Sequence, residues 1–179
     1  MSLANGRHYL AIPGPSVMPD RVLQAMHRAA PNIYTGELID MVAGMVPDLK
    51  TVADTKHHVA MYICNGHGVW EAALVNTFSR GDKVLVLGTG RFGTGWGDTA
   101  RALGINTEVL DFGGSADVDA EQLAEVLAAD KAHEIKGVLA VHVDTSTSVK
   151  NNIQAVRACL DAANHPALLF SDNIASLGC

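Results

Sequence analysis

Short apolar segments alternate with helical patterns through most of this 179-residue chain, and this alternation restricts the fold more than any other feature of the sequence. Strands are expected at residues 59–64, 84–87, 105–110, 135–143 and 167–170. Helices are expected at residues 66–78, 93–103, 119–129 (with Asp119 as N-cap) and 152–163. Apolar runs of strand length that alternate with helices predict an α/β fold with three layers (α/β/α), in which helices cover both faces of a mainly parallel sheet.

The first part of the chain lacks this alternation. Two prolines near the N-terminus, Pro13 and Pro15, fix the backbone and predict an extended arm that ends in a rigid turn. Helices are expected at 20–30 and at 37–54, and Pro47 should kink the second helix or split it into two. The expected domains are an N-terminal arm with the first helix (1–36) and a partial large domain (37–179).

The composition argues against several classes of function. The net charge is −6 at pH 7 and the basic residues are scattered, so neither a nucleic acid nor a membrane surface is an expected partner. No apolar run approaches the length of a membrane span, and the N-terminus lacks the hydrophobic region of a signal peptide. The cysteines Cys64, Cys159 and Cys179 lack the spacing of a metal site. We therefore expect reduced thiols, no metal and a cytoplasmic location.

A glycine motif follows the strand expected at 84–87. Gly88, Gly90 and Gly93 have the spacing of the dinucleotide-binding fingerprint, in which glycines let the backbone approach a phosphate at a helix N-terminus. Asp111 lies about 20 residues further on, where an acid binds a ribose hydroxyl in such proteins. This motif favours an NAD(P)-dependent oxidoreductase. Its position disfavours one, because a complete strand–glycine–helix unit precedes it.

That earlier unit contains a second glycine turn. Asn65, Gly66 and His67 connect the strand expected at 59–64 to the helix expected at 66–78. Such a turn presents free N–H groups and the positive end of the helix dipole to an anion. An ordinary strand-to-helix turn is the alternative, and for an isolated Gly-x-Gly it is the more frequent one.

Polar residues follow the last two expected strands. Residues 144–148 are a carboxylate and four hydroxyl side chains, which form either a solvated loop or the wall of a polar site. Asp172 lies at the tip of the last strand, where a buried acid needs a donor or a cation. It is either an N-cap or a carboxylate that holds a protonated heteroaromatic nitrogen, as at pyridoxal phosphate sites. An anion cradle, an aromatic residue, a hydroxyl cluster and an acid at one sheet edge suit pyridoxal phosphate better than a dinucleotide.

At these residues the sequence resembles the class V pyridoxal-phosphate-dependent aminotransferases, specifically the serine/alanine–glyoxylate (serine–pyruvate) branch. The resemblance covers essentially the whole chain and rests on four motifs: 13–16, 65–67 leading into 71–74, 90–93 and 172–178. It implies the large domain of the type I pyridoxal-phosphate-dependent transferases, truncated and without the C-terminal small domain. It also implies a homodimer.

The resemblance further implies roles for individual residues. They are Asn65, Gly66 and His67 (cofactor phosphate), Phe92 (stacking on the pyridine ring), Ser146 (hydrogen bond to the cofactor), Asp172 (pyridinium nitrogen) and Gly14 (near the substrate carboxylate). The Schiff-base lysine of the family lies beyond the aspartate motif, and this chain ends at Cys179 before such a lysine. We therefore expect a truncated protein that is inactive by itself.

The implied reaction is the pyridoxal-phosphate-dependent transamination of a small amino acid, serine or alanine, with glyoxylate or pyruvate. Two residues depart from the family pattern: Asp144 and Ser148 stand where relatives commonly have a glutamate and a glycine. An NAD(P)-dependent oxidoreductase stays open as an alternative. A third reading is a degenerate domain kept as a binding or dimerisation module.

Overall fold

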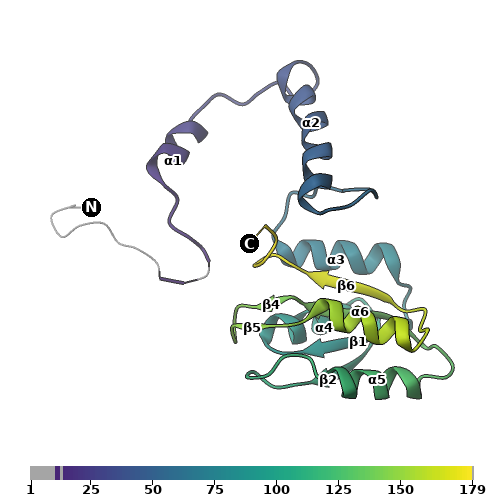
Figure 1. Cartoon of the computed structure of the whole chain (residues 1–179). Helices are drawn as coiled ribbons and strands as arrows, with labels where there is room; N and C mark the ends of the chain where they lie inside the picture. Colours follow the sequence, from purple (N-terminus) through teal and green to yellow (C-terminus); the bar gives the residue numbers. More distant parts are fainter. Residues whose placement is uncertain (1–10, 13, 179) are drawn as a thin grey trace. The chain divides into compact units, whose positions relative to one another are not determined.

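The structure, a computed structural model, describes residues 11–12 and 14–178 (Figure 1). Contacts between residues divide the chain into two compact units, Met1–Val59 and Ala60–Cys179. The domain division expected at residue 36 stays a prediction.

The first unit contains two helices, α1 (Asp20–Met26) and α2 (Glu37–Val52). Helix α1 is shorter than predicted. Helix α2 runs through Pro47 as one element, because one lost backbone hydrogen bond does not end a helix of 16 residues. Of the two predicted effects of Pro47, the split is therefore wrong, and the kink stays a prediction. Neither helix buries a residue, and their exposed apolar side chains are Val22, Leu23, Met26, Ile39, Met41, Val42, Met45 and Val52.

The second unit is built on a four-stranded sheet in the order β2-β1-β3-β6. Its strands are β1 (Lys83–Gly88), β2 (Asn106–Asp111), β3 (Ile135–Val141) and β6 (Leu168–Asp172). All three pairings are parallel, which confirms the predicted parallel sheet. The strand predicted at 59–64 is wrong. These residues have no ladder partner among the described strands, and Met61, Tyr62 and Ile63 are exposed.

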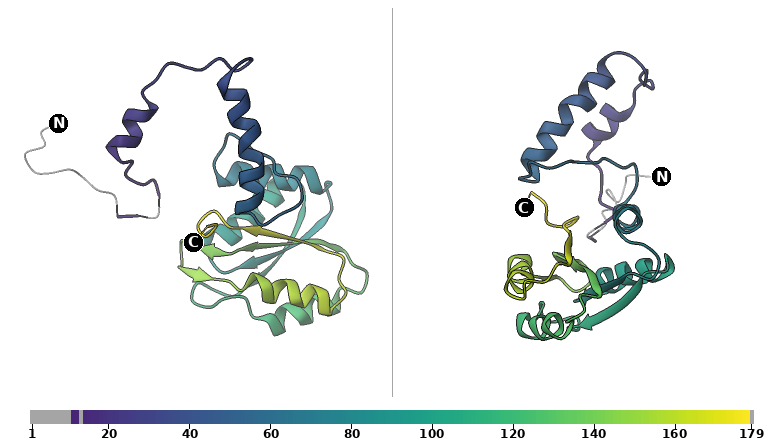
Figure 2. Two further views of the ribbon diagram at one scale, coloured as in Figure 1. Left: turned by 45° about the horizontal axis from the view of Figure 1, so that its top comes forward. Right: turned by 90° about the vertical axis from the view of Figure 1, so that its right-hand side faces the viewer.

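Helices cover both faces of this sheet, which confirms the three-layer α/β/α prediction (Figure 2). Along β1, Val84 and Val86 pack on one face against α3 (Gly66–Thr77) and α4 (Arg91–Ala102). Leu85 and Leu87 point to the other face, because successive strand side chains alternate. There they pack against α5 (Ala120–Ala129), which has the expected Asp119 N-cap, and against α6 (Ile153–Ala162). No helix in the described part of the chain is long and apolar enough to cross a membrane.

A short antiparallel hairpin follows β3, and it contains the polar residues 144–148. Its strands are β4 (Val143–Asp144) and β5 (Val149–Lys150). Ser148, between them, has φ 64°, a left-handed conformation that favours glycine. Ser148, where relatives commonly have glycine, therefore adopts a backbone conformation that glycine would adopt more easily.

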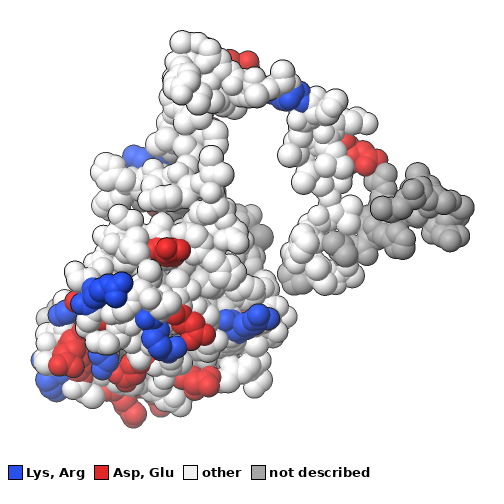
Figure 3. Space-filling view, turned by 180° about the vertical axis from the view of Figure 1, so that it is seen from behind, with Lys and Arg blue, Asp and Glu red and all other residues white. Residues whose placement is uncertain are grey.

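Charged side chains of both signs are mixed on the surface of the second unit. On the face shown in Figure 3, Lys and Arg lie among Asp and Glu over this unit. Some form ion pairs, such as Lys83 with Glu108 at 2.6 Å and Arg157 with Asp161 at 2.7 Å. This face therefore carries no continuous basic surface of the kind that binds nucleic acid.

A buried histidine–carboxylate pair lies at the edge of the sheet where β3 begins. Nδ1 of His165 accepts the N–H of Ala167, so its ring proton is on Nε2, which lies 3.2 Å from Oδ2 of Asp130. Asp130 also accepts the backbone N–H groups of Glu134 and Ile135. Burial raises the pKa of Asp130, but these hydrogen bonds and His165 outweigh burial and hold the pKa below its ordinary value.

Replacing Asp130 by asparagine should lower the free energy of unfolding at pH 7 by about 1–2 kcal/mol, because the amide repels one of the N–H donors. The folded-state pKa of Asp130 is below the unfolded value of about 3.9, so its stabilisation is present above that pH. It is lost as the pH falls through the folded-state pKa. Urea unfolding across this range, with the exposed Asp161→Asn as control, checks the prediction. A stability difference between the unsubstituted protein and Asp130→Asn that is constant with pH would contradict it.

Candidate functional site

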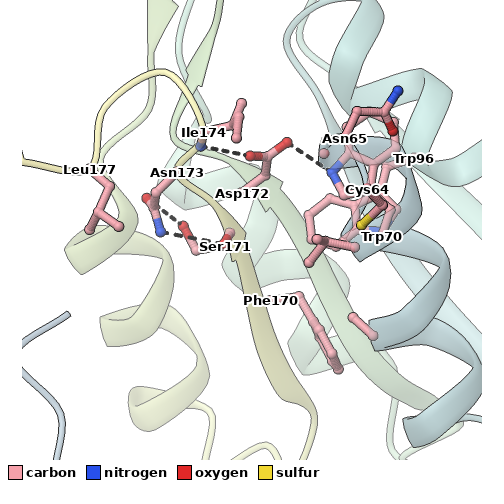
Figure 4. Close-up of a pocket in the computed structure, with 13 residues that line it drawn as sticks. Cys64, Asn65, Trp70, Trp96, Phe170, Ser171, Asp172, Asn173, Ile174 and Leu177 are labelled. Atoms are coloured by element: carbon pink, nitrogen blue, oxygen red, sulfur yellow. Dashed lines mark hydrogen bonds between the residues drawn. The ribbon is translucent and has the colours of Figure 1, made fainter. Parts of the chain in front are cut away.

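A cavity of about 600 Å³ lies at the edge of the sheet where the parallel strands end (Figure 4). The start of α3, the end of β6 and the turn after β6 form its walls. Its lining residues are Cys64, Asn65, Gly66, Val69, Trp70, Ala73, Trp96, Phe170, Ser171, Asp172, Asn173, Ile174 and Leu177. Ligands of open parallel sheets bind at this edge, so the cavity is the candidate site.

Asp172 is the acid of this cavity, and both of its carboxylate oxygens are hydrogen-bonded. The indole N–H of Trp70 donates to Oδ2 at 2.8 Å, and the backbone N–H of Ile174 donates to Oδ1 at 2.9 Å (Figure 4). The side chain is half-buried. Asp172 therefore caps the turn after β6 and also presents a carboxylate to the cavity, so the two readings of this residue from sequence are compatible.

The start of α3 offers free hydrogen-bond donors. Asn65 is the N-cap, and its side chain accepts the N–H of Gly68 at 3.2 Å. Its backbone carbonyl accepts the N–H groups of Gly68 and Val69. The N–H groups of Gly66 and His67 have no hydrogen-bond partner in the described part of the chain. Two free donors at the positive end of a 12-residue helix form a suitable site for an anion.

The start of α4, by contrast, is already occupied by a carboxylate from the same chain. Oδ2 of Asp144 accepts the N–H groups of Phe92 and Gly93 at 2.9 and 3.1 Å. Oδ1 accepts the N–H and the hydroxyl of Ser146 at 3.1 and 2.6 Å. Asp144 is fully buried, and a Cβ at Gly90 would collide with its carboxylate.

This carboxylate weighs against the dinucleotide hypothesis. A pyrophosphate at the Gly88–Gly93 loop would need the N–H groups that Asp144 occupies, and its charge would meet a buried carboxylate of like sign. Gly90 is needed to leave room for Asp144 itself. Asp111 is exposed and accepts the N–H of Gly113 in a local turn. Helix capping by Asp144 therefore explains Gly90 and leaves no free N–H groups at Phe92 and Gly93 for a nucleotide phosphate.

Aromatic rings surround the start of α3. The His67 ring is 4.5 Å from Trp70 and 6.2 Å from Phe92, measured between ring centroids. Trp70 is stacked on Trp96 at 5.6 Å with an interplanar angle of 12°. Phe92 is half-buried in this group, outside the set of residues that line the cavity. Its stacking role stays a prediction.

The remaining predicted residues are distributed as follows. Ser146, in the hairpin between β4 and β5, contacts the start of α4. Its hydroxyl accepts the N–H of Arg91 at 2.9 Å and donates to Asp144. Ser146 and Ser148 are exposed, and Ser146 takes part in the cap of α4; none of the residues of the hydroxyl cluster is among those that line the cavity. Gly14 is exposed in the first unit. No group of three or more His, Cys, Asp and Glu in the described residues could hold a metal ion.

Two residues of the site were missed from the sequence. Trp70 was assigned no role, although a buried indole N–H usually finds a partner and an acid stands at the neighbouring strand end. Asp144 was treated as part of the polar cluster and as a departure from the family pattern, but not as a helix cap. The helix that it caps begins more than 50 residues earlier in the chain, so no local pattern identifies this role.

Gly68 leaves room for the side chain that precedes the helix. A Cβ at Gly68 would lie 2.7 Å from Cβ of Cys64 and 3.0 Å from its Sγ. We expect Gly68→Ala to destabilise the protein by about 1–3 kcal/mol through overpacking. The control Gly95→Ala, where the nearest atom is 4.0 Å away in Trp70, should be neutral or stabilising by up to about 1 kcal/mol. Urea unfolding checks both.

Adding Cys64→Gly to Gly68→Ala removes the atom that the new Cβ meets. The double variant should therefore recover stability relative to Gly68→Ala. Equal stability of the two would show that the contact with Cys64 is not the cause.

The chain was compared with known proteins. No protein-family model matches it. The serine–glyoxylate aminotransferase of Methylorubrum extorquens is 41% identical over 174 residues, which is 97% of this chain and 43% of that protein. The L-aspartate–glyoxylate aminotransferase of Paracoccus denitrificans is 39% identical over 173 residues, or 93% and 42% of the two chains. A crystal structure of alanine–glyoxylate aminotransferase from Nostoc sp. matches with a TM-score of 0.77 and 26% identity, over 93% of this chain and 43% of that one.

The chain thus spans less than half the length of the relatives that it matches, while nearly all of its own length is matched. The names of these relatives agree with the family that the motifs of the sequence resemble. Over nearly its whole length, the chain is therefore similar to a part of the serine–, aspartate– and alanine–glyoxylate aminotransferases.

Proposed function

We propose that this chain is the cofactor-binding portion of an aminotransferase that uses pyridoxal phosphate. The observation that carries the proposal is the pair of free N–H groups at Gly66 and His67, at the end of a cavity that also contains Asp172. One helix start with two donors matches a single phosphate. A carboxylate in the same cavity matches a pyridinium nitrogen.

The residues present fit this cofactor. The cavity of about 600 Å³ is within the size range of small-molecule sites. Asn65, Gly66 and His67 would hold the phosphate, and Asp172 would keep a proton on the ring nitrogen. When bound, the cofactor supplies an electron sink that stabilises a carbanion at the substrate Cα.

The other predicted residues complete the proposal. Phe92 would stack on the pyridine ring, since its backbone is fixed by Asp144. The Ser146 hydroxyl donates its proton to Asp144, so it would contact the cofactor only as an acceptor. Gly14 would lie near the substrate carboxylate. We propose serine or alanine as the amino donor and glyoxylate or pyruvate as the acceptor, because the relatives are named for serine, alanine or aspartate with glyoxylate.

We also propose a homodimer. Helices α1 and α2 bury none of their residues and expose eight large apolar side chains, a surface that a second copy would cover. Sedimentation analysis of the protein tests this point.

A cytoplasmic location is proposed from the free thiols of Cys64 and Cys159, and imaging of a tagged protein tests it.

Titration with pyridoxamine 5′-phosphate should quench the tryptophan fluorescence of the chain in a saturable way. This compound has no aldehyde and cannot react with surface lysines, and both tryptophans of the chain line the cavity. Pyridoxamine, which lacks the phosphate, should bind at least about 10-fold more weakly, because hydrogen bonds to a charged group contribute about 1.5–3 kcal/mol each.

NADH is the control ligand for the alternative function, and it should give no saturable change. Saturable NADH binding without pyridoxamine phosphate binding would favour the oxidoreductase. Equal affinity for pyridoxamine and its phosphate would contradict the assignment of the α3 start as the phosphate site.

A further inference from the structure

We propose that Trp70 is a positioning residue that holds the Asp172 carboxylate in the orientation needed at the cofactor ring. The inference rests on the proposed function of Asp172. It assigns a role to a residue that is not among the proposed cofactor-binding residues.

The hydrogen bond from Trp70 joins two distant parts of the chain. Nε1 of Trp70, in the second turn of α3, donates to Oδ2 of Asp172 at the end of β6, 102 residues later in the sequence. The backbone N–H of Ile174 donates to Oδ1. A carboxylate has about four acceptor positions, so one on each oxygen remains for a ligand in the cavity. With a donor on each oxygen, the carboxylate plane cannot turn without losing a hydrogen bond.

The donor itself is held by neighbouring rings. Trp70 is 4% exposed and stacks on Trp96, and the His67 ring lies against it edge-on at 4.5 Å and 63°. Trp96 in turn meets Phe170 of β6 at 6.5 Å and 88°. The indole plane is therefore fixed before any ligand binds, which is the arrangement expected of a preorganised site.

Trp96 shows that packing alone does not explain this contact. It is 3% exposed, belongs to the same core cluster and lines the same cavity. Yet its buried Nε1 has no hydrogen-bond partner among the described residues. Both indoles are buried in the same cluster, but only the Trp70 N–H donates to a carboxylate. Trp96 therefore serves as an internal control for the Trp70 hydrogen bond.

The first experiment is independent of any cofactor. The chain has two tryptophans, so heteronuclear NMR of the labelled chain should show two indole N–H resonances, assigned with Trp70→Phe and Trp96→Phe. The Trp70 proton should resonate downfield of the Trp96 proton, because it donates to a charged acceptor. Asp172→Ala should move the Trp70 resonance upfield and leave that of Trp96 nearly in place. An unmoved Trp70 resonance would overturn the inference.

The second experiment measures affinity for pyridoxamine 5′-phosphate in a double-mutant cycle. Trp70→Phe keeps an aromatic ring in the stack and removes the donor, and it should weaken binding by about 5- to 10-fold. In the Asp172→Ala background the same substitution should change affinity less than about 2-fold, because the donor has lost its partner. A purely structural role of Trp70 would give the same loss in both backgrounds, and that result would overturn the positioning role.

The failures of the two proposals are distinguishable. If the unsubstituted chain binds pyridoxamine phosphate and the losses are additive, only the positioning role of Trp70 is overturned. If the unsubstituted chain does not bind while the Trp70 resonance responds to Asp172→Ala, the cofactor assignment fails and the positioning role fails with it.

Discussion

Replacing Asp144 by asparagine should destabilise the α/β unit by about 3 kcal/mol, because it breaks a buried network around a charged acceptor. The carboxylate of Asp144 accepts four hydrogen bonds, two from the start of α4 and two from Ser146. An amide of the same shape can accept on one oxygen only, so its NH₂ group must face either the two helix N–H groups or Ser146. The negative charge at the helix N-terminus is lost as well.

Asp111→Asn is the matched control for this change. Asp111 is the other acid of the apparent dinucleotide motif, but it is exposed and accepts one local N–H, so its replacement should cost less than about 1 kcal/mol. Urea unfolding of the two variants beside the unsubstituted protein measures the difference. A loss of equal size at both positions would contradict the assignment of Asp144 as the cap of α4.

The two glycine turns explain why a spacing motif alone misled. Both follow the same local rule, a turn that leads into a helix N-terminus. They differ in whether a distant side chain already satisfies the helix donors. The donors of α4 are occupied by Asp144, which lies 51 residues after Gly93 in the sequence. At α3, in contrast, Asn65 leaves the N–H groups of Gly66 and His67 free. No pattern within a window of about ten residues contains that information, so it became visible only in the folded chain.

The sheet could be predicted because its signal is local and strong. The β1 segment is apolar at Val84 through Leu87 and buried on both faces, as a central parallel strand requires. The apolar segment at 59–64 gave the same signal and is not a strand here. A strand is defined by its partner, and the described chain offers none beside it.

The candidate site was predicted in part for the same reason. The start of a helix locates Asn65 and Gly66 from the sequence, and the end of a parallel strand locates Asp172. Both line the same cavity, although the strand expected before Asn65 is absent. The contact of Trp70 with Asp172 depends on how α3 packs on the sheet, and periodicity does not encode the direction of an indole N–H. Local patterns therefore predict which elements meet at the site, and tertiary packing decides which donor meets which acceptor.

Asp172→Asn should lower transamination on the order of 10²- to 10³-fold in a complete protein that contains this chain and a Schiff-base lysine, because truncating a hydrogen-bonded charge pair costs about 2–5 kcal/mol. The amide can still accept from Ile174 or Trp70, so the fold and part of the cofactor affinity should remain. The amide lacks the negative charge that would stabilise the protonated ring nitrogen. The loss should therefore appear in kcat more than in KM, since charge develops on the ring during the reaction.

Steady-state assays with serine and glyoxylate, at saturating cofactor, measure the effect of Asp172→Asn. The exposed Asp161→Asn is the matched control and should retain full turnover, because Asp161 lies on α6 and pairs only with Arg157 among the described contacts. Turnover that is unchanged in Asp172→Asn would remove Asp172 from the reaction. A loss confined to KM, with kcat intact, would show that the carboxylate binds the ground state and the transition state equally well. That result would contradict the proposed role of Asp172 at the cofactor ring, which rests on its place in the same cavity as the start of α3.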